Sequence, residues 1–191
     1  MWSDLILLAM VCGPVREAAQ IPRGPGAAKL LLEASVIVVG SVLPSAQWVV
    51  TPEDMIGKST KRPDGTIHYE NASIGDFLLG RLINFQIDEI LRGQREIKSD
   101  ISFRVFCEGL STGEGEPRYL LAERYLLFLK PLDKANDRFK GTALYNLNDS
   151  SKIAFDPSAV YTPISRLYGA VLLRPGGDEI IQRVREILGK K

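Results

Sequence analysis

The chain has 191 residues, of which 45% are hydrophobic, and its 24 Lys and Arg residues nearly balance 23 Asp and Glu residues. This length suffices for one domain with a sizeable core, and the near-zero net charge excludes a global field that attracts nucleic acid or an anionic membrane. With only Cys12, Cys107 and a single histidine, the sequence lacks a disulfide framework and the ligands of a structural zinc site.

The N-terminus predicts a signal peptide over residues 1–20. Residues 5–13 form an apolar block of signal length, too short to span a bilayer, and the small residues Ala18 and Ala19 resemble a cleavage region. An apolar N-terminal helix, or an upstream start-site error, is the alternative. Cleavage near Gln20 would remove Cys12 and leave one cysteine.

A linker and a first strand are predicted next. Residues 21–29 carry two prolines and two glycines and predict a linker in which neither helix nor strand persists. Residues 30–33 could form one helical turn. Residues 34–43 are rich in β-branched side chains and predict a buried strand, with a bulge or a close backbone approach at Gly40.

Residues 45–79 predict a long loop, which in a compact domain is more often functional or mobile than merely connecting. Turn residues at positions 63–65 indicate a small hairpin between Lys61 and Tyr69. This loop is a candidate recognition element because loops on a rigid scaffold often carry binding residues.

Two features of the same loop invite a functional interpretation. GKST at residues 57–60 resembles part of a phosphate loop, but Pro52 stands where the upstream glycine of that motif belongs. The sole histidine, His68, has Glu70 nearby, and a solvated polar loop residue is the favoured interpretation.

Residues 80–93 predict a half-buried strand, because apolar residues occupy every second position from residue 83 to residue 87. The alternation slips at residues 89–90, which indicates a β-bulge. Asp88 and Glu89 are adjacent in the strand and therefore face opposite sides, so we expect solvated charges and no shared acid–base site.

Residues 101–107 alternate again and place Cys107 on the apolar face, where an inert core thiol is the favoured interpretation. GLSTG at residues 109–113 fits the pattern of a nucleophile elbow around Ser111. That pattern needs a helix after it and a histidine later in the chain, whereas His68 comes earlier. A glycine-rich hairpin loop is therefore favoured.

Residues 118–131 predict the central strand. Odd- and even-numbered residues alike are apolar from Tyr125 to Leu129, so both faces of this strand require burial. Residues 139–147 predict a fifth strand. Residues 148–175 predict loop with short extended pieces at 154–155 and 169–173.

The C-terminus predicts an amphipathic helix over residues 176–191, with Asp178 as candidate N-cap and Gly189 as the stop. Its apolar positions lie on one stripe at helical spacing. They are Ile180, Ile181, Val184, Ile187 and Leu188.

Together these elements predict a mainly β fold, a five-stranded OB-like antiparallel barrel over residues 30–175 with a C-terminal helix packed on it. The strand sequences SVIVVGSV, FQIDEILRG and AERYLLFLKP resemble those of small bacterial exported proteins that are similar to the netrin-like module of tissue inhibitors of metalloproteinases. The similarity covers about residues 33–147, with Ala122 where the group has glycine. It implies a fold and export. The inhibitors' zinc-chelating N-terminal cysteine and their disulfides have no counterpart in this sequence, so protease inhibition is not implied.

We predict no catalytic, cofactor-binding or metal-binding residues. The favoured function is a non-enzymatic exported module, periplasmic or secreted, that binds an unknown protein or small ligand through loops such as 45–79 and 109–117. No transmembrane span is predicted, and the oligomeric state is left open.

The alternative is an intracellular OB-type protein that binds nucleic acid through a basic groove with Phe106 as a stacking ring. The groove residues are Arg81, Arg92, Arg95, Lys98 and Arg104. Near-zero net charge and low aromatic content argue against nucleic acid as partner. A second alternative is an enzyme of unrecognised type.

Overall fold

The structure is a computed structural model of the chain. It describes residues 10–11, 16–17, 25–44, 48–53, 59–64, 67–69, 78–93, 103–108, 118–119, 121–149, 151–164 and 169–189.

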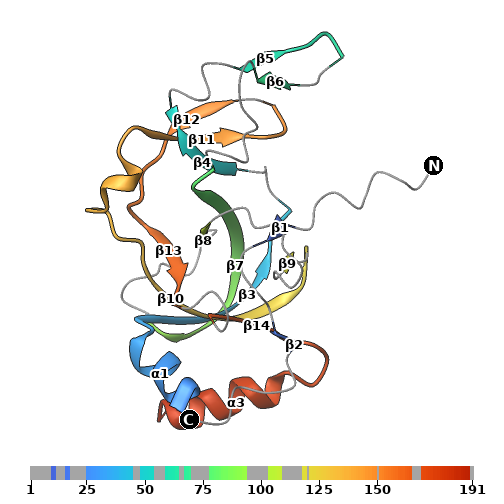
Figure 1. Cartoon of the computed structure of the whole chain (residues 1–191). Helices are drawn as coiled ribbons and strands as arrows, with labels where there is room; N and C mark the ends of the chain where they lie inside the picture. The colour runs from blue at the N-terminus through green and yellow to red at the C-terminus, as the bar shows by residue number, and fades with distance from the viewer. Residues whose placement is uncertain are drawn as a thin grey trace, which may run out of the picture.

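Five strands form a closed β-barrel (Figure 1). In order around the barrel they are β3 (Val36–Val42), β7 (Gly80–Arg92), β8 (Phe103–Glu108), β13 (Val160–Pro163) and β10 (Arg124–Pro131), which pairs back to β3. The β8–β13 pair is parallel and the other four pairs are antiparallel. The predicted mainly β, OB-like five-stranded barrel is confirmed, but its sheet is mixed and not wholly antiparallel.

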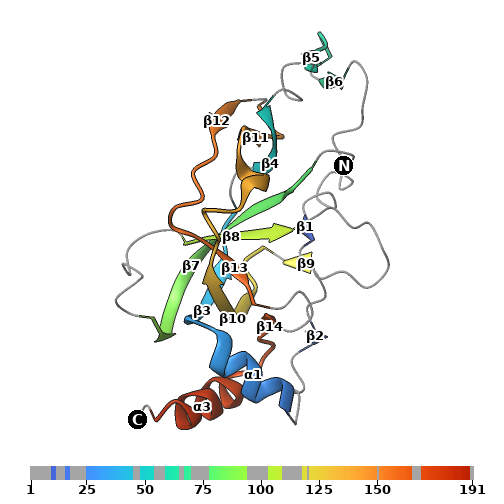
Figure 2. The ribbon, with the colours of Figure 1, turned by 60° about the vertical axis from the view of Figure 1, so that its left-hand side comes forward.

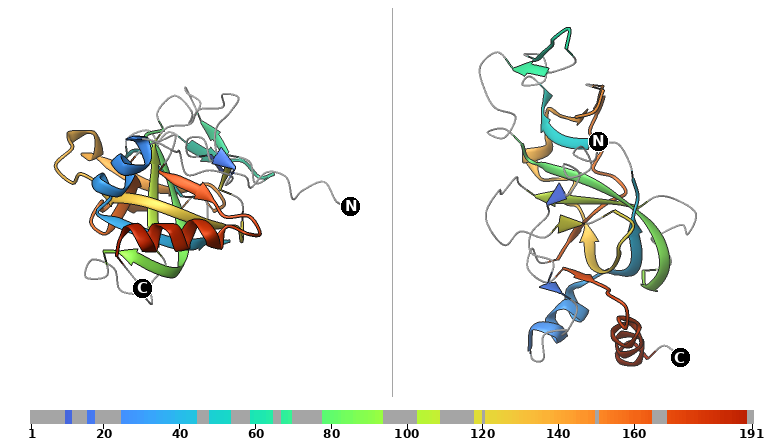
Figure 3. Two further views of the ribbon diagram at one scale, coloured as in Figure 1. Left: turned by 90° about the horizontal axis from the view of Figure 1, so that it is seen from below. Right: turned by 90° about the vertical axis from the view of Figure 1, so that its right-hand side faces the viewer.

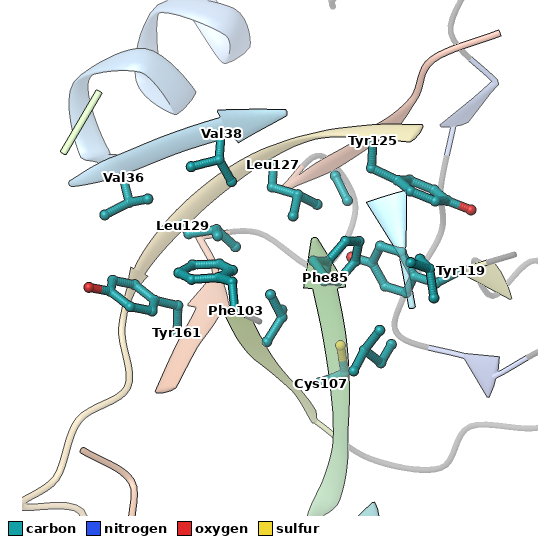
Figure 4. Close-up of a cluster of buried hydrophobic side chains, with 14 of the residues drawn as sticks. Val36, Val38, Phe85, Phe103, Cys107, Tyr119, Tyr125, Leu127, Leu129 and Tyr161 are labelled. Carbon is teal, nitrogen blue, oxygen red and sulfur yellow. The ribbon is translucent and has the colours of Figure 1, made fainter. Parts of the chain in front are cut away.

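The central strand β10 has both faces buried, as predicted. Tyr125, Leu127 and Leu129 lie in the barrel interior, shown in Figure 4, whereas Leu126 and Phe128 belong to a second cluster outside the wall. All five side chains are at most 1% exposed. Successive strand residues point to opposite faces, so the continuous apolar run requires one core on each side of β10.

The fifth barrel strand is not the predicted one. Residues 139–147 hold the end of the short helix η2 (Asp137–Phe139) and the strand β11 (Thr142–Asn146), which pairs with β4 (Trp48–Pro52) and β12 (Lys152–Ala154). These three strands extend the sheet beyond the barrel, at the end opposite the helices (Figures 1 and 2). The barrel is closed by β13, in a stretch predicted to be loop.

The extension has its own apolar cluster, which explains the apolar pattern of β11. The cluster joins residues from β4, β7, β8, β11, β13 and the connections that follow β10 and β12. Its members are Val50, Leu82, Phe106, Leu132, Phe139, Leu144, Phe155 and Val160. β4 itself lies in the stretch that we predicted as a long loop.

Two helices cover the outer face of the barrel wall, which is clearest in the view from below in Figure 3. α1 (Pro25–Glu33) contributes Leu30 and Leu31, and α3 (Asp178–Ile187) contributes Ile181 and Val184, to the cluster outside β3 and β10. No helix in the described ranges is long and apolar enough to cross a membrane.

The ends of these helices correct two predictions. α1 begins at Pro25, inside the predicted linker, because proline at the first helical position has a suitable φ and needs no N–H partner. The N-cap of α3 is Gly177, so Asp178 is the first helical residue and makes no cap. Gly189 has φ +68°, which confirms the predicted C-terminal stop.

The remaining strands are short. β5 (Ser59–Lys61) and β6 (Ile67–Tyr69) form the predicted hairpin, and β14 (Ala170–Leu172) pairs with β10 within the predicted extended piece. The others are β1 (Met10–Val11) with β9 (Arg118–Tyr119), and β2 (Arg16–Glu17) beside β14.

Glycine allows close backbone approach at two barrel positions. A methyl group on Gly40 would lie 2.7 Å from the Gln86 carbonyl oxygen, and the β3–β7 register shifts between Val39 and Gly40, which confirms the predicted bulge. A methyl group on Gly80 would overlap the Cys107 carbonyl oxygen and ring carbons of Phe106, the latter at 2.5 Å.

Candidate functional site

Arg81 is the most unusual charged residue of the described barrel. Arg81 is paired with Val49 of β4 on one side and with Cys107 of β8 on the other. Val49 is in turn paired with Tyr145 of β11, so that the four residues form one row across four antiparallel strands. Directly opposed residues project from the same face of a sheet, about 5 Å apart. The three neighbours are at most 2% exposed, so a cation lies in an otherwise buried row. We call Arg81, Val49, Cys107 and Tyr145 the Arg81 site.

The orientation of β7 explains this position. Arg81 has the same parity as Ile83 and Phe85, which lie in the barrel interior, and the β7–β8 register is unbroken between them. Arg81 therefore lies on the interior-facing side of β7, at the end of the barrel where β4 joins (Figure 1).

The Arg81 guanidinium is half-buried and incompletely bonded. Its Nε is fully buried and has no hydrogen-bond partner in the described part of the chain. Burial lowers the pKa of Arg81 from its ordinary value, but an arginine remains charged in a protein. A buried donor without an acceptor is costly, and the geometry that removes the cost is a carboxylate or phosphate received by the guanidinium fork.

Cys107 departs from its prediction. Its place on the apolar face is confirmed, since it is 2% exposed within the interior cluster. The prediction of an inert free thiol is wrong, because Cys107 is disulfide-bonded. The sequence pattern showed its burial but gave no sign of its partner.

Asp88 and Glu89 face different partners, as their adjacency in the strand required. Asp88 accepts hydrogen bonds from Ser41 at 3.1 Å and from Arg124 at 3.3 Å. Glu89 binds Arg185 of α3 through both carboxylate oxygens, at 2.7–3.0 Å. Both are ion-paired and not merely solvated: Asp88 joins β7 to Arg124 of β10, and Glu89 joins β7 to α3.

The predicted basic groove is not assembled by the described residues. Arg92 lies at the other end of the 13-residue strand β7 from Arg81, where it donates to the carbonyl oxygens of Leu31 and Ala34 at the end of α1. Arg104 is exposed and has the opposite parity to Cys107, so it and Arg81 lie on opposite faces.

Phe106 is not available as a stacking ring. It is 1% exposed and packs edge-on against Phe139, with ring centroids 5.4 Å apart. The Arg138 guanidinium covers both rings, 5.6 Å and 4.7 Å from their centroids. Arg95 and Lys98 lie outside the described residues.

Several other sequence candidates cannot be placed in a site. Ser111, Cys12 and the Gly57–Lys58 half of GKST lie outside the described residues, while Ser59 and Thr60 belong to the β5–β6 hairpin. His68 is paired opposite Thr60 in that hairpin. Across the described residues, no three His, Cys, Asp or Glu side chains are grouped as metal ligands.

The barrel interior is filled by aliphatic and aromatic side chains (Figure 4). Tyr119 enters from β9 and contacts Phe85 and Tyr125, with centroid distances of 5.5 Å and 4.9 Å. Its hydroxyl is buried without a hydrogen-bond partner among the described residues. Burial, and then the neighbouring Tyr125, raises the pKa of Tyr119 well above its ordinary value.

Comparisons with protein-family models, with curated proteins and with solved structures found no match for this chain. The strand resemblance noted above is therefore supported at the level of fold, by the five-stranded closed barrel, and no family is assigned.

Proposed function

We propose that this protein is a non-enzymatic, exported binding module that holds an anionic group of its ligand at the Arg81 site. The observation that carries the proposal is the half-buried Arg81 guanidinium, whose buried Nε has no acceptor among the described residues. Carboxylates and phosphates match the guanidinium fork in charge and shape. Arg92, Arg124 and Arg185, by contrast, each donate hydrogen bonds to acceptors of the protein itself, and the Arg138 guanidinium lies over the rings of Phe106 and Phe139.

The scaffold supports a binding role. The interior cluster and the cluster outside β10 hold the barrel strands on both faces, so the ends of β7 and β8 are fixed in position. A site built on packed strands keeps its geometry without a ligand, which lowers the entropic cost of binding.

The disulfide at Cys107 supports export. Disulfides persist in oxidising compartments such as the periplasm or the extracellular space and are rare in the reducing cytosol. A structural disulfide beside the Arg81 site therefore agrees with the extracytoplasmic location that the N-terminal sequence predicts.

Thermal unfolding with small anions tests the binding proposal. Acetate, citrate, phosphate and a short single-stranded DNA are added at constant ionic strength, with chloride as reference. A ligand that binds only the folded state stabilises it by about 2.7 kcal/mol at a hundred times its Kd. We expect a concentration-dependent rise in the unfolding temperature of the wild type that is lost in Arg81→Gln.

Arg104→Gln is the matched control, because Arg104 is an exposed arginine on the neighbouring strand and on the opposite face. It is expected to respond to the anions as the wild type does. Equal responses in all three proteins would refute a site at Arg81, and a response confined to DNA and lost in Arg104→Gln would favour the nucleic-acid alternative.

A further inference from the structure

We propose that the ligand of the Arg81 site is an amphiphilic organic monocarboxylate, such as a medium-chain fatty acid, whose apolar chain lies against the leucines beside the site. The inference rests on the proposed function, because it requires an anion at Arg81, and it adds the chemical class of the molecule that carries this anion. It is drawn from the apolar surface next to Arg81 and from the charges of the row in which Arg81 lies.

An apolar cluster lies on the same face of the sheet as Arg81. Val49, which is paired directly with Arg81, belongs to it, and the cluster continues onto β11. Both strands belong to the extension, which leaves the barrel at this end of β7 (Figures 1 and 2). We call these residues the Val49 cluster. Its members are Val49, Ala143, Tyr145, Leu78 and Leu147.

The Val49 cluster offers apolar surface at its leucines. Val49, Ala143 and Tyr145 are at most 1% exposed and have no surface left for a ligand. Leu78 and Leu147 pack against them and stay partly exposed. Apolar surface beside a guanidinium favours a molecule that brings both a carboxylate and an apolar chain, because each part then meets the surface that suits it.

The charges of the row favour a head group with one negative charge. Beyond Tyr145 the row reaches Lys152, whose ammonium lies 3.4 Å from the Glu53 carboxylate. Arg81 has no carboxylate partner among the residues that the structure describes. One carboxylate neutralises Arg81 and accepts two parallel N–H groups from it. A phosphate ester carries nearly two charges at neutral pH, and its second charge would remain unpaired beside buried apolar residues, which is costly.

A homologous series of carboxylates tests the inference. Acetate, butyrate, hexanoate and octanoate are titrated calorimetrically into the full chain and into Arg81→Gln, at constant ionic strength and below the concentration at which octanoate forms micelles. In the wild type we expect binding to tighten about fourfold for each methylene group that is buried. Hexanol and hexyl phosphate should bind more weakly than hexanoate, and Arg81→Gln should lose the binding of all carboxylates.

The possible outcomes separate this inference from the proposed function. Binding that depends on Arg81 but is equally tight for acetate and octanoate would overturn the amphiphile and leave the anion site standing. Octanoate binding that is unchanged in Arg81→Gln would overturn it as well, because the chain would then bind without the head group. If no carboxylate binds, and citrate and phosphate do not bind either, the proposed function fails together with the inference.

Asparagine variants locate the apolar chain. Leu147→Asn removes partly exposed apolar surface from the Val49 cluster, and we expect it to weaken octanoate binding about tenfold while acetate binding is unchanged. Ile153→Asn is the matched control, because Ile153 is half-exposed and is paired with Leu144 on the opposite face of the extension. Equal losses in the two variants would contradict the placement of the chain. If Leu147→Asn does not fold, the chain-length series on the wild type still decides.

Discussion

Replacement of Arg81 by methionine should stabilise the unliganded protein. The substitution removes a half-buried guanidinium whose Nε has no acceptor among the described residues, and it keeps an unbranched stem beside Val49 and Cys107. A buried unsatisfied donor costs about 1–3 kcal/mol. Because Arg81 remains partly exposed, we take the low end and expect the free energy of unfolding to rise by about 1 kcal/mol.

Urea-induced unfolding followed by circular dichroism measures this change as a shift in midpoint at constant m-value. The control is Arg104→Met, an exposed position where we expect a change within about 0.5 kcal/mol. A loss of stability in Arg81→Met larger than in the control would refute the reasoning, because it would mean that the folded protein itself satisfies this guanidinium. A stabilised variant that no longer responds to anions would show a residue retained for binding at the expense of stability.

Three further substitutions test the barrel wall, its interior and its helix. Gly80→Ala should destabilise the fold by about 1–3 kcal/mol, because the added methyl overlaps the Cys107 carbonyl and the Phe106 ring; unchanged stability in urea would contradict that close approach. Tyr119→Phe removes a buried hydroxyl that lacks a partner and should be neutral or stabilising by up to about 1 kcal/mol. Because the pKa of Tyr119 is raised in the folded protein, its contribution to the free energy of unfolding is complete below the ordinary tyrosine pKa of about 10 and is lost as the pH rises above it. Tyr119→Phe should therefore lose less stability than the wild type when the pH is raised above about 10. An equal loss of stability in the two proteins at alkaline pH would argue against a buried Tyr119. Ile181→Ala, at a position 3% exposed, should cost about 2–4 kcal/mol, whereas Ile187→Ala, 58% exposed on the same helix, should change stability by about 0.5 kcal/mol at most; similar costs would mean that α3 does not pack as described.

Elements that depend on residues close together in the sequence were predictable. The two-sided apolar run of β10 required a core on each face, and the structure supplies the barrel interior on one side and the α1–α3 cluster on the other. The bulge at Gly40 and the stop at Gly189 were also predictable, since glycine is needed there for close approach and for a positive φ.

Barrel closure was not predictable, because it depends on pairings between distant segments. β13 is four residues long and ends in proline, so its sequence resembles a loop until β8 and β10 flank it. β11 is buried at all five positions, as a barrel strand would be, yet its partners are β4 and β12 in the extension. Apolar pattern shows that a strand is buried but not which core buries it.

The candidate site was partly visible in the sequence. Arg81 has the parity of Ile83 and Phe85, and a charged residue on the apolar face of an alternating strand is the signal that could have marked it. A basic groove that contains both Arg81 and Arg104 is incompatible with the strand pairing, because Arg104 projects from the opposite face. The disulfide of Cys107 was not predicted, because the alternation of β8 shows that the side chain is buried but not that its sulfur is bonded.

The most direct test of the binding claim is an NMR titration of the arginine Nε–H resonances. The Arg81 resonance is assigned by its absence in Arg81→Gln, and acetate or phosphate is then added to the wild type at constant ionic strength. We predict a saturable shift of that resonance, larger than the shift of Arg104 on the opposite face. An Arg81 resonance that does not move, or that moves without saturation together with the exposed arginines, would contradict an anion site at this end of the barrel.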